Sequence, residues 1–251
     1  SLVREDGAMD LYHGHLRAID ASGNIIFDQV DYQNFNDYLM EEVRSWSYMK
    51  FPFIKNRGNL DGWYRVGPLS RMNTAGFIDT PLADEAHREF RNLTQWRPNH
   101  MSLAYHWARM IEVLHCVEKI KELLHDPDLQ GTDLQTRGER RAEGIGVIEA
   151  PRGTLFHHYR VDENDLVTFC NLIVSTTNNN EAMNRAVTQV AREHLSNKDK
   201  ITEGMLNQIE VAVRAYDPCL SCATHALGQM PLQVELFDAD GRLLDQMTRD
   251  A

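Results

Sequence analysis

Residues 217–225 read Asp-Pro-Cys-Leu-Ser-Cys-Ala-Thr-His and place two thiols three positions apart, with an imidazole three positions further on. One turn of chain can direct all three groups toward a single point. Thiolates are soft ligands, and a pair at this spacing is typical of half a metal site. The stretch therefore predicts a metal site near the C-terminus, with Cys219, Cys222 and His225 as candidate ligands.

Spacing alone leaves three interpretations of this cysteine pair open. A structural zinc site needs four ligands, but Cys116 and Cys170 are isolated in an apolar helix and an apolar strand, so we expect both to be small buried hydrophobic residues. A thioredoxin-like redox pair would open a helix after a strand, whereas this pair follows a predicted helix. The third interpretation is that the pair has no special role. The spacing favours metal binding.

Composition limits the classes of function. The chain has 251 residues and a net charge of −11, from 37 acidic against 26 basic residues. A nucleic-acid-binding surface needs a basic footprint, so this class is disfavoured. The sequence shows no apolar run near the ~20 residues of a membrane span and no signal peptide, and we expect a cytoplasmic protein. Because the chain opens at Ser1 directly in strand-like sequence, we also expect that it lacks its natural N-terminus.

The hydrophobic pattern predicts an α+β fold that is mainly helical, with long packed helices forming a core bundle beside small antiparallel meanders and hairpins. No repeat, low-complexity segment or domain linker interrupts it. Residues 47–80 are expected to form a buried, ordered loop, and residues 128–143 an exposed one. The expected strands are residues 8–11, 15–20, 25–30, 144–150, 153–161, 166–174, 232–237 and 242–245; the expected helices are residues 32–46, 81–94, 99–124, 181–195 and 202–216.

A second motif, Glu-Ala-Pro-Arg-Gly at residues 149–153, lies at the turn between two of these strands. Such a bend presents the permanent charge and fixed donors of Arg152, although a plain surface arginine is the simpler local interpretation. Glu139, Glu143 and Glu149 are expected on a solvated face, with Glu149 adjoining the motif. Of the histidines at 157 and 158, one is expected to pack in the core.

Together these motifs resemble the large subunit of nickel–iron hydrogenases. The resemblance runs from about residue 8 to the end and includes Gly-Trp-Tyr-Arg-Val-Gly-Pro-Leu at 62–69 and Ser-Thr-Thr-Asn at 175–178. Residues 214–230 are most similar to the cytoplasmic NAD-reducing, bidirectional group. Coenzyme F420-type and heterodisulfide-reductase-linked enzymes share much of the pattern.

The resemblance implies a nickel–iron centre whose iron also carries carbon monoxide and cyanide. It implies that Cys219 is a terminal nickel ligand and that Cys222 bridges nickel and iron. Arg152 would lie over the open metal position, Asp217 would orient that arginine, and Pro151 would wall the site. The remaining implied positions are Thr176 near a cyanide, and His225 with the carbonyl of Leu172 at a second cation such as magnesium.

The resemblance also implies partners: H2, a small subunit with iron–sulfur clusters, and diaphorase subunits with FMN that pass electrons to NAD. The family's second cysteine pair is not in this sequence, so the resemblance implies that the N-terminal half of the natural protein is absent, and we expect the isolated chain to be inactive. A maturation endopeptidase is expected to cut after His225, which divides the chain into a unit 1–225 and an extension 226–251. A zinc-binding interaction module and a complex I-type subunit that has lost its metal are the competing interpretations from other classes.

Overall fold

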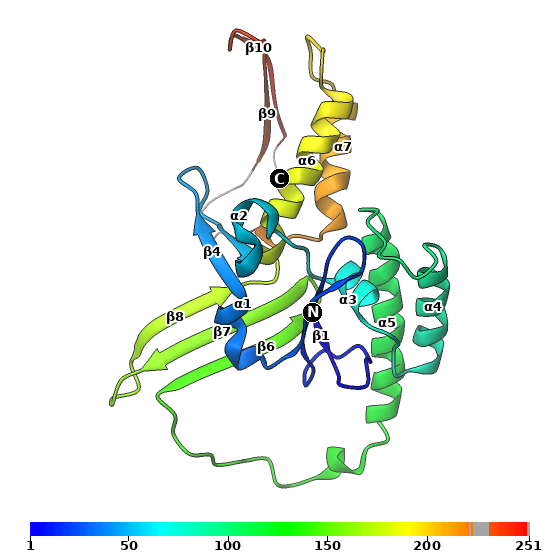
Figure 1. Ribbon diagram of the computed structural model, residues 1–251, viewed down its shortest axis with the longest axis vertical. Helices are drawn as coiled ribbons and strands as arrows, with labels where there is room; N and C mark the ends of the chain where they lie inside the picture. The colour runs from blue at the N-terminus through cyan, green and yellow to red at the C-terminus, as the bar shows by residue number, and fades with distance from the viewer. Residues whose placement is uncertain (221, 223–230, 250–251) are drawn as a thin grey trace.

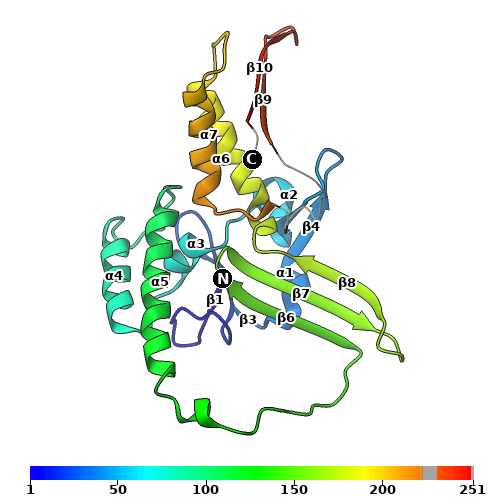
Figure 2. The same cartoon turned by 180° about the vertical axis from the view of Figure 1, so that it is seen from behind.

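The structure is a computed structural model, and it describes residues 1–220, 222 and 231–249. It confirms the α+β class, with 38% helix and 26% strand. Figure 1 shows a helical pair, α4 and α5, on one side of the molecule, a curved sheet on the other side, and a second helical pair, α6 and α7, above them. Figure 2 shows the same arrangement from behind.

The N-terminal sheet has the order β1-β2-β3 and is antiparallel. Its strands are β1 (Leu2–Val3), β2 (His15–Ile19) and β3 (Ile25–Val30). The expected strand at residues 8–11 is wrong. That segment contributes only isolated bridges to Val3 and Phe77, because the edge position beside β2 is taken by the buried pair Leu2–Val3.

The helix expected at residues 32–46 is also wrong beyond its first turns. After η1 (Tyr32–Asn34) and α1 (Phe35–Tyr38), the chain enters β4 (Leu39–Val43), which pairs antiparallel with β5 (Lys50–Ile54). The partner strand lies within residues 47–80, which were expected to be irregular. That stretch also holds η2 (Lys55–Arg57), α2 (Gly58–Asp61) and α3 (Pro68–Thr74). Pairing with the next strand along the chain overrides a local helical pattern that is only a few residues long.

The large curved sheet confirms three expected strands: β6 (Glu143–Ala150), β7 (Gly153–Val161) and β8 (Val167–Ile173), in the order β6-β7-β8. Ala150 pairs with Gly153, so the two strands are joined by a tight turn of two residues, Pro151 and Arg152. Phe156 and Ile173 of this sheet pack with Phe35 of α1 in one core cluster. The turn between β6 and β7 thus carries the arginine motif at one end of the sheet.

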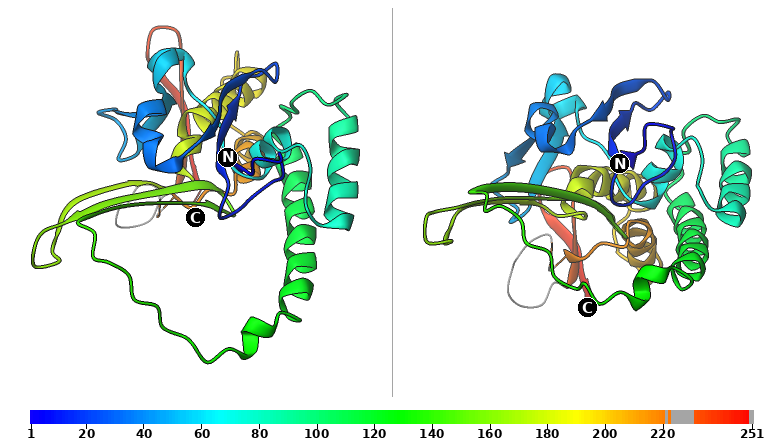
Figure 3. Two further views of the ribbon diagram at one scale, coloured as in Figure 1. Left: turned by 60° about the horizontal axis from the view of Figure 1, so that its bottom comes forward. Right: turned by 90° about the horizontal axis from the view of Figure 1, so that it is seen from below.

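The helices confirm the other expected segments. They are α4 (Pro81–Asn92), α5 (Ala104–Leu123), α6 (Asn180–His194) and α7 (Glu203–Ala215), with short η3 (Pro127–Gln130) and η4 (Thr177–Asn179). At about 1.5 Å per residue, the 20 residues of α5 span about 30 Å. Residues 121–144 are all exposed. The long connection that they include sweeps away from the body between α5 and β6 (Figure 3).

Helix α5 is apolar on two sides. Its core side contains Tyr105, Ala108 and Ile111, which are buried. The helix was expected to pack in the core, but other apolar residues on it are exposed, Met110 at 63% and Val117 at 56%. They recur with 3- and 4-residue spacing along the opposite side, which is why the sequence pattern looked like a single broad face.

The expected terminal hairpin is confirmed as β9 (Leu232–Phe237) and β10 (Leu243–Arg249). Arg249 contacts Glu203 and Glu210 of α7, and Asp245 accepts a hydrogen bond from the amide of Ile201 at 2.8 Å. Along the part of the chain that the structure describes, no helix has the length and apolar content needed to cross a membrane.

Buried His87 makes the stability of the fold depend on pH. Its Nε2–H donates to the carbonyl of Met72 at 2.8 Å, and its Nδ1 is buried without a hydrogen-bond partner among the described residues. Burial lowers the pKa of His87 below its ordinary 6.5. The unfolded chain therefore binds more protons near that pH, and the free energy of unfolding falls as pH drops below about 6.5.

We expect His87→Gln to flatten this dependence, as measured by urea unfolding between about pH 5 and pH 8. Exposed His125→Gln is the control and should leave the slope unchanged. An H87Q slope equal to that of the parent chain would contradict the assignment. His115, whose pKa burial also lowers, accounts for the slope that remains.

Candidate metal centre

The end of helix α7 sets the direction in which the chain enters the cysteine motif. Thr202 caps its N-terminus by accepting from the amide of Met205, as the sequence predicted. At its other end Asp217 adopts a left-handed conformation (φ 50°), and its amide donates to the carbonyl of Arg214 at 2.9 Å. A left-handed residue just after a helix turns the chain sharply, and a following proline prevents the helix from continuing. The chain thus leaves α7 abruptly at the cysteine motif.

Arg152 comes from the turn between β6 and β7 and meets the residue that ends α7. Its Nε–H donates to the carbonyl oxygen of Asp217 at 2.6 Å, and the Asp217 carboxylate lies 3.4 Å from the same nitrogen. Both side chains are 40–45% exposed, so water screens the charge interaction strongly. The backbone hydrogen bond therefore fixes the geometry, and it joins the two motifs across 65 residues.

Thr176 holds the first cysteine of the motif. It lies in the turn after β8 and is 2% exposed, and its Oγ1 accepts the amide N–H of Cys219 at 3.1 Å. A third segment therefore reaches the same place. Cys219 itself is half-buried and Cys222 is exposed.

Two buried asparagines connect residues 62–69 to the arginine turn. Asn179 accepts the amide of Val66 at 2.9 Å and donates to the carbonyl of Arg152 at 3.4 Å. Asn178 accepts the hydroxyl of Tyr64 at 2.6 Å and donates to the carbonyl of Thr154 at 2.8 Å. Residues 175–180, although polar, are all buried, and their side-chain amides serve as internal connectors.

The turn tolerates no side chain at its glycine. Gly153 has φ 142°, and a Cβ there would lie 2.1 Å from a methyl carbon of Val66. The carbonyl of Arg152 also approaches Gly67 closely, since a Cβ on Gly67 would lie 2.8 Å from that oxygen. The four motifs that carried the resemblance therefore pack directly on one another.

Glu149 does not lie on a solvated face. Its side chain is fully buried and accepts from Arg71 at 2.6 Å, from the hydroxyl of Thr154 at 2.7 Å and from the amide of Leu2 at 3.0 Å. Glu143 is exposed, as expected, although it contacts His158 at 2.6 Å. The two residues are six positions apart and so lie on the same face of β6, whose burial increases along the strand; Glu143 lies at its exposed end and Glu149 at its buried end.

The sequence analysis missed Arg71 and Glu112 altogether. Arg71 on α3 is 1% exposed and contacts Glu112 of α5 as well as Glu149. Burial raises the pKa of Glu112, and Arg71 opposes that change. Burial alone would lower the pKa of Arg71, but the two carboxylates outweigh it and raise that pKa. The sequence did offer one signal, a charged residue within each of two apolar helical patterns. Charged residues are almost never buried unless they are paired, so such positions indicate a buried ion pair.

Several predicted residues have other outcomes. Cys116 and Cys170 are exposed, so their expected burial is wrong. They lie on outward sides of α5 and β8, where a small apolar residue is tolerated.

Of His157 and His158, His158 is buried, which confirms that one of the two packs in the core. Pro151 is exposed, and Leu172 pairs with His157 within the curved sheet. His225 lies outside the described residues.

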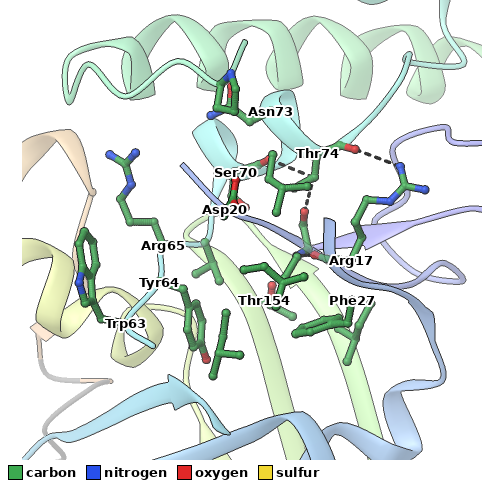
Figure 4. A pocket seen from close by; sticks show the side chains of 18 of the residues that line it. Arg17, Asp20, Phe27, Trp63, Tyr64, Arg65, Ser70, Asn73, Thr74 and Thr154 are labelled. Atoms are coloured by element: carbon green, nitrogen blue, oxygen red, sulfur yellow. Dashed lines mark hydrogen bonds between the residues drawn. The ribbon is translucent and has the colours of Figure 1, made fainter. Parts of the chain in front are cut away.

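A cavity of about 290 Å³ lies beside this centre but is not part of it. The residues lining it come from β2, β3, residues 61–74 and the start of β7, and none of the predicted site residues is among them. Figure 4 shows Tyr64 and Thr154 at one side of it, and Arg17 donating to the carbonyl of Thr74 at 3.2 Å. Its lining holds no thiol, so the site chemistry is assigned to the convergent motifs instead.

The Thr176 contact is open to a direct test. We expect Thr176→Val, which keeps the shape but removes the acceptor, to lower the free energy of unfolding by about 1 kcal/mol. Thr176→Ser keeps the hydroxyl and is the control. Hydrogen exchange of the Cys219 amide should accelerate in the valine variant only. Equal exchange in both variants would contradict the role of the hydroxyl.

Comparison with known proteins places these motifs in a family. The family described as "Nickel-dependent hydrogenase" matches residues 2–225. The beta chain of the NAD-reducing hydrogenase HoxS of Cupriavidus necator is 55% identical over 99% of this chain and 51% of its own length. An iron-sulfur subunit of the F420-non-reducing hydrogenase of Archaeoglobus profundus is 41% identical over 96% of this chain and 51% of its own length.

A solved structure agrees. The crystal structure of an NAD+-reducing [NiFe]-hydrogenase in the H2-reduced state superposes with a TM-score of 0.85 at 54% identity, covering 90% of this chain and 50% of that one. The chain thus spans about half the length of the relatives it matches. On the family match and these identities, the chain belongs to the nickel-dependent hydrogenase family.

Proposed function

We propose that this chain is the C-terminal part of the catalytic subunit of a nickel–iron hydrogenase that cleaves H2 reversibly and passes the electrons to NAD. The observation that carries the proposal is the convergence of Arg152, Asp217 and the amide of Cys219 through hydrogen bonds. Segments from the β6–β7 turn, the β8–α6 turn and the end of α7 meet there. Such convergence of a cation, a carboxylate and a thiol is typical of a catalytic site.

The donor set fits part of a nickel–iron centre. Cys219 and Cys222 would hold the metals through their sulfur atoms, since soft thiolates suit low-valent nickel. His225 and the carbonyl of Leu172 would hold a magnesium or similar cation. The described residues contain no cluster of three or more potential metal-ligating side chains. Because the chain spans about half the length of the relatives it matches, we propose that the other two thiolates belong to the part of the subunit that this chain does not cover.

The bound metals would supply a hydride acceptor, and the residues of this chain would supply the rest. Asp217 binds Nε–H of Arg152 through its carbonyl, so the charged guanidinium is held in a fixed orientation toward the motif. A preorganised cation of this kind would stabilise negative charge at the motif once the assembled enzyme excludes water from the site. The Cys219 sulfur would accept the proton, with Pro151 closing the wall beside it.

NAD is the favoured electron acceptor, because identity to the NAD-reducing relative is 55% and to the F420-non-reducing relative 41%. Electrons would leave through the iron–sulfur clusters of a small subunit, from which they would reach FMN in diaphorase subunits. Coupling to coenzyme F420 or to heterodisulfide reductase is the second candidate. We propose that the assembled enzyme works in the cytoplasm.

The division after His225 is also a proposal, and two observations support it. The family match ends at residue 225. Strands β9 and β10 form a hairpin of their own beyond it. A maturation endopeptidase would cut between His225 and Ala226 once nickel is bound.

Cleavage is tested by mass spectrometry of the nickel-replete protein isolated with its partners. We expect a mass lower by residues 226–251. The cysteine variant described next, which should not retain nickel, should keep the extension. Nickel-replete protein that still ends at Ala251 would contradict processing.

Nickel binding is tested by elemental analysis of the partner-bound enzyme. We expect nickel, with iron in excess because the iron–sulfur clusters of the small subunit also contain it. We expect loss of nickel in Cys219→Ser, because a hydroxyl is a much poorer ligand than a thiolate for this metal. Cys116→Ser, which changes an exposed cysteine on α5, is the matched control and should keep its nickel. Zinc in place of nickel would favour an interaction module, and absence of both nickel and zinc would favour a complex I-type subunit.

A further inference from the structure

Arg71 hydrogen-bonds to the backbone of the turn that carries Arg152. Its Nη1 donates to the carbonyl of Ala150 at 3.1 Å, and its Nη2 donates to the carbonyl of Pro151 at 3.3 Å. These are the two residues immediately before Arg152. The carbonyl of Arg152 itself accepts from Asn179. Three successive carbonyls of the turn are therefore bound by side chains from α3 and η4.

The guanidinium is itself anchored on both sides. Nη2 donates to Glu112 of α5 at 2.7 Å, Nε also donates to Glu112, and Nη1 donates to Glu149 of β6 at 2.6 Å. The two carboxylates thus fix the plane of the Arg71 guanidinium, and the same guanidinium binds the carbonyls of Ala150 and Pro151. A planar group with five donors can bind all four partners at once, whereas an ammonium with three donors cannot.

We infer that Arg71 is a positioning residue for Arg152. Its hydrogen bonds go to Glu112, Glu149 and the carbonyls of Ala150 and Pro151, and not to the described residues of the cysteine motif. By binding the carbonyls of Ala150 and Pro151 it sets where the Arg152 side chain begins, and so keeps Nε–H of Arg152 on the carbonyl of Asp217. Its consequence for hydrogen chemistry rests on the proposed function, but the geometric role does not.

Arg91 offers a matched control within the same helical layer. It is also buried, and it donates to the backbone carbonyls of Met72, Asn73 and Trp96. Replacing it by lysine removes the same kind of contact from the C-terminal end of α3, at Met72 and Asn73. The hydrogen bonds that Arg91 makes do not involve the arginine turn. A general loss of stability should therefore appear in both variants, and a change at Arg152 in only one.

The primary test follows the Arg152 Hε resonance in the 15N-arginine-labelled chain. In Arg71→Lys we expect its exchange with water to accelerate by about tenfold, the change that corresponds to losing one hydrogen bond. Arg91→Lys should leave that exchange unchanged. Unaltered exchange in Arg71→Lys, or equal acceleration in both variants, would overturn the inference.

If Arg71→Lys does not fold, the double variant Arg71→Lys with Glu112→Gln pairs one ammonium with one carboxylate, and the same acceleration is expected. In the complete enzyme, Arg71→Lys should lower H2-dependent NAD reduction toward the level of Arg152→Lys while nickel content stays unchanged. A parent enzyme without nickel would reject the proposed function, yet the exchange measurement would still decide the role of Arg71.

Discussion

One hydrogen bond, from Nε–H of Arg152 to the carbonyl of Asp217, joins the sheet and helix that carry the site. It can form only because two backbone features agree. The turn after β6 must project Arg152, which its close contact with residues 62–69 enforces. The end of α7 must also expose a carbonyl, which the left-handed Asp217 provides. The rest of the core orients these two elements.

The buried charges show why this rigidity matters. Arg71 lies between Glu112 and Glu149, all with side chains at most 11% exposed, so two negative charges face one positive charge in the interior. Removing one partner from such a group typically costs about 3–5 kcal/mol, because an uncompensated charge is left behind. A cluster this costly to disturb is suited to holding a turn in one position.

Local chemistry made some features readable from sequence and left others hidden. The Thr202 cap, the strands on both sides of Arg152, and the cysteine motif after a helix each follow from short-range rules. Strand β4 does not, because its pairing with β5 overrides a local helical pattern. Buried Glu149 does not, because its partner Arg71 lies 78 residues away in the chain. The hydrogen bond from Cys219 to Thr176 spans 43 residues and has no local signature.

The exposed connection between α5 and β6 has a consequence for how this chain can diverge. Glu112 and Glu149 are brought together by Arg71, so the two ends of the connection are fixed by the core and not by the loop itself. Doubling the length of a flexible loop costs only about 0.6 kcal/mol in closure entropy. Insertions and deletions can therefore accumulate there across related sequences while the arginine turn stays in place.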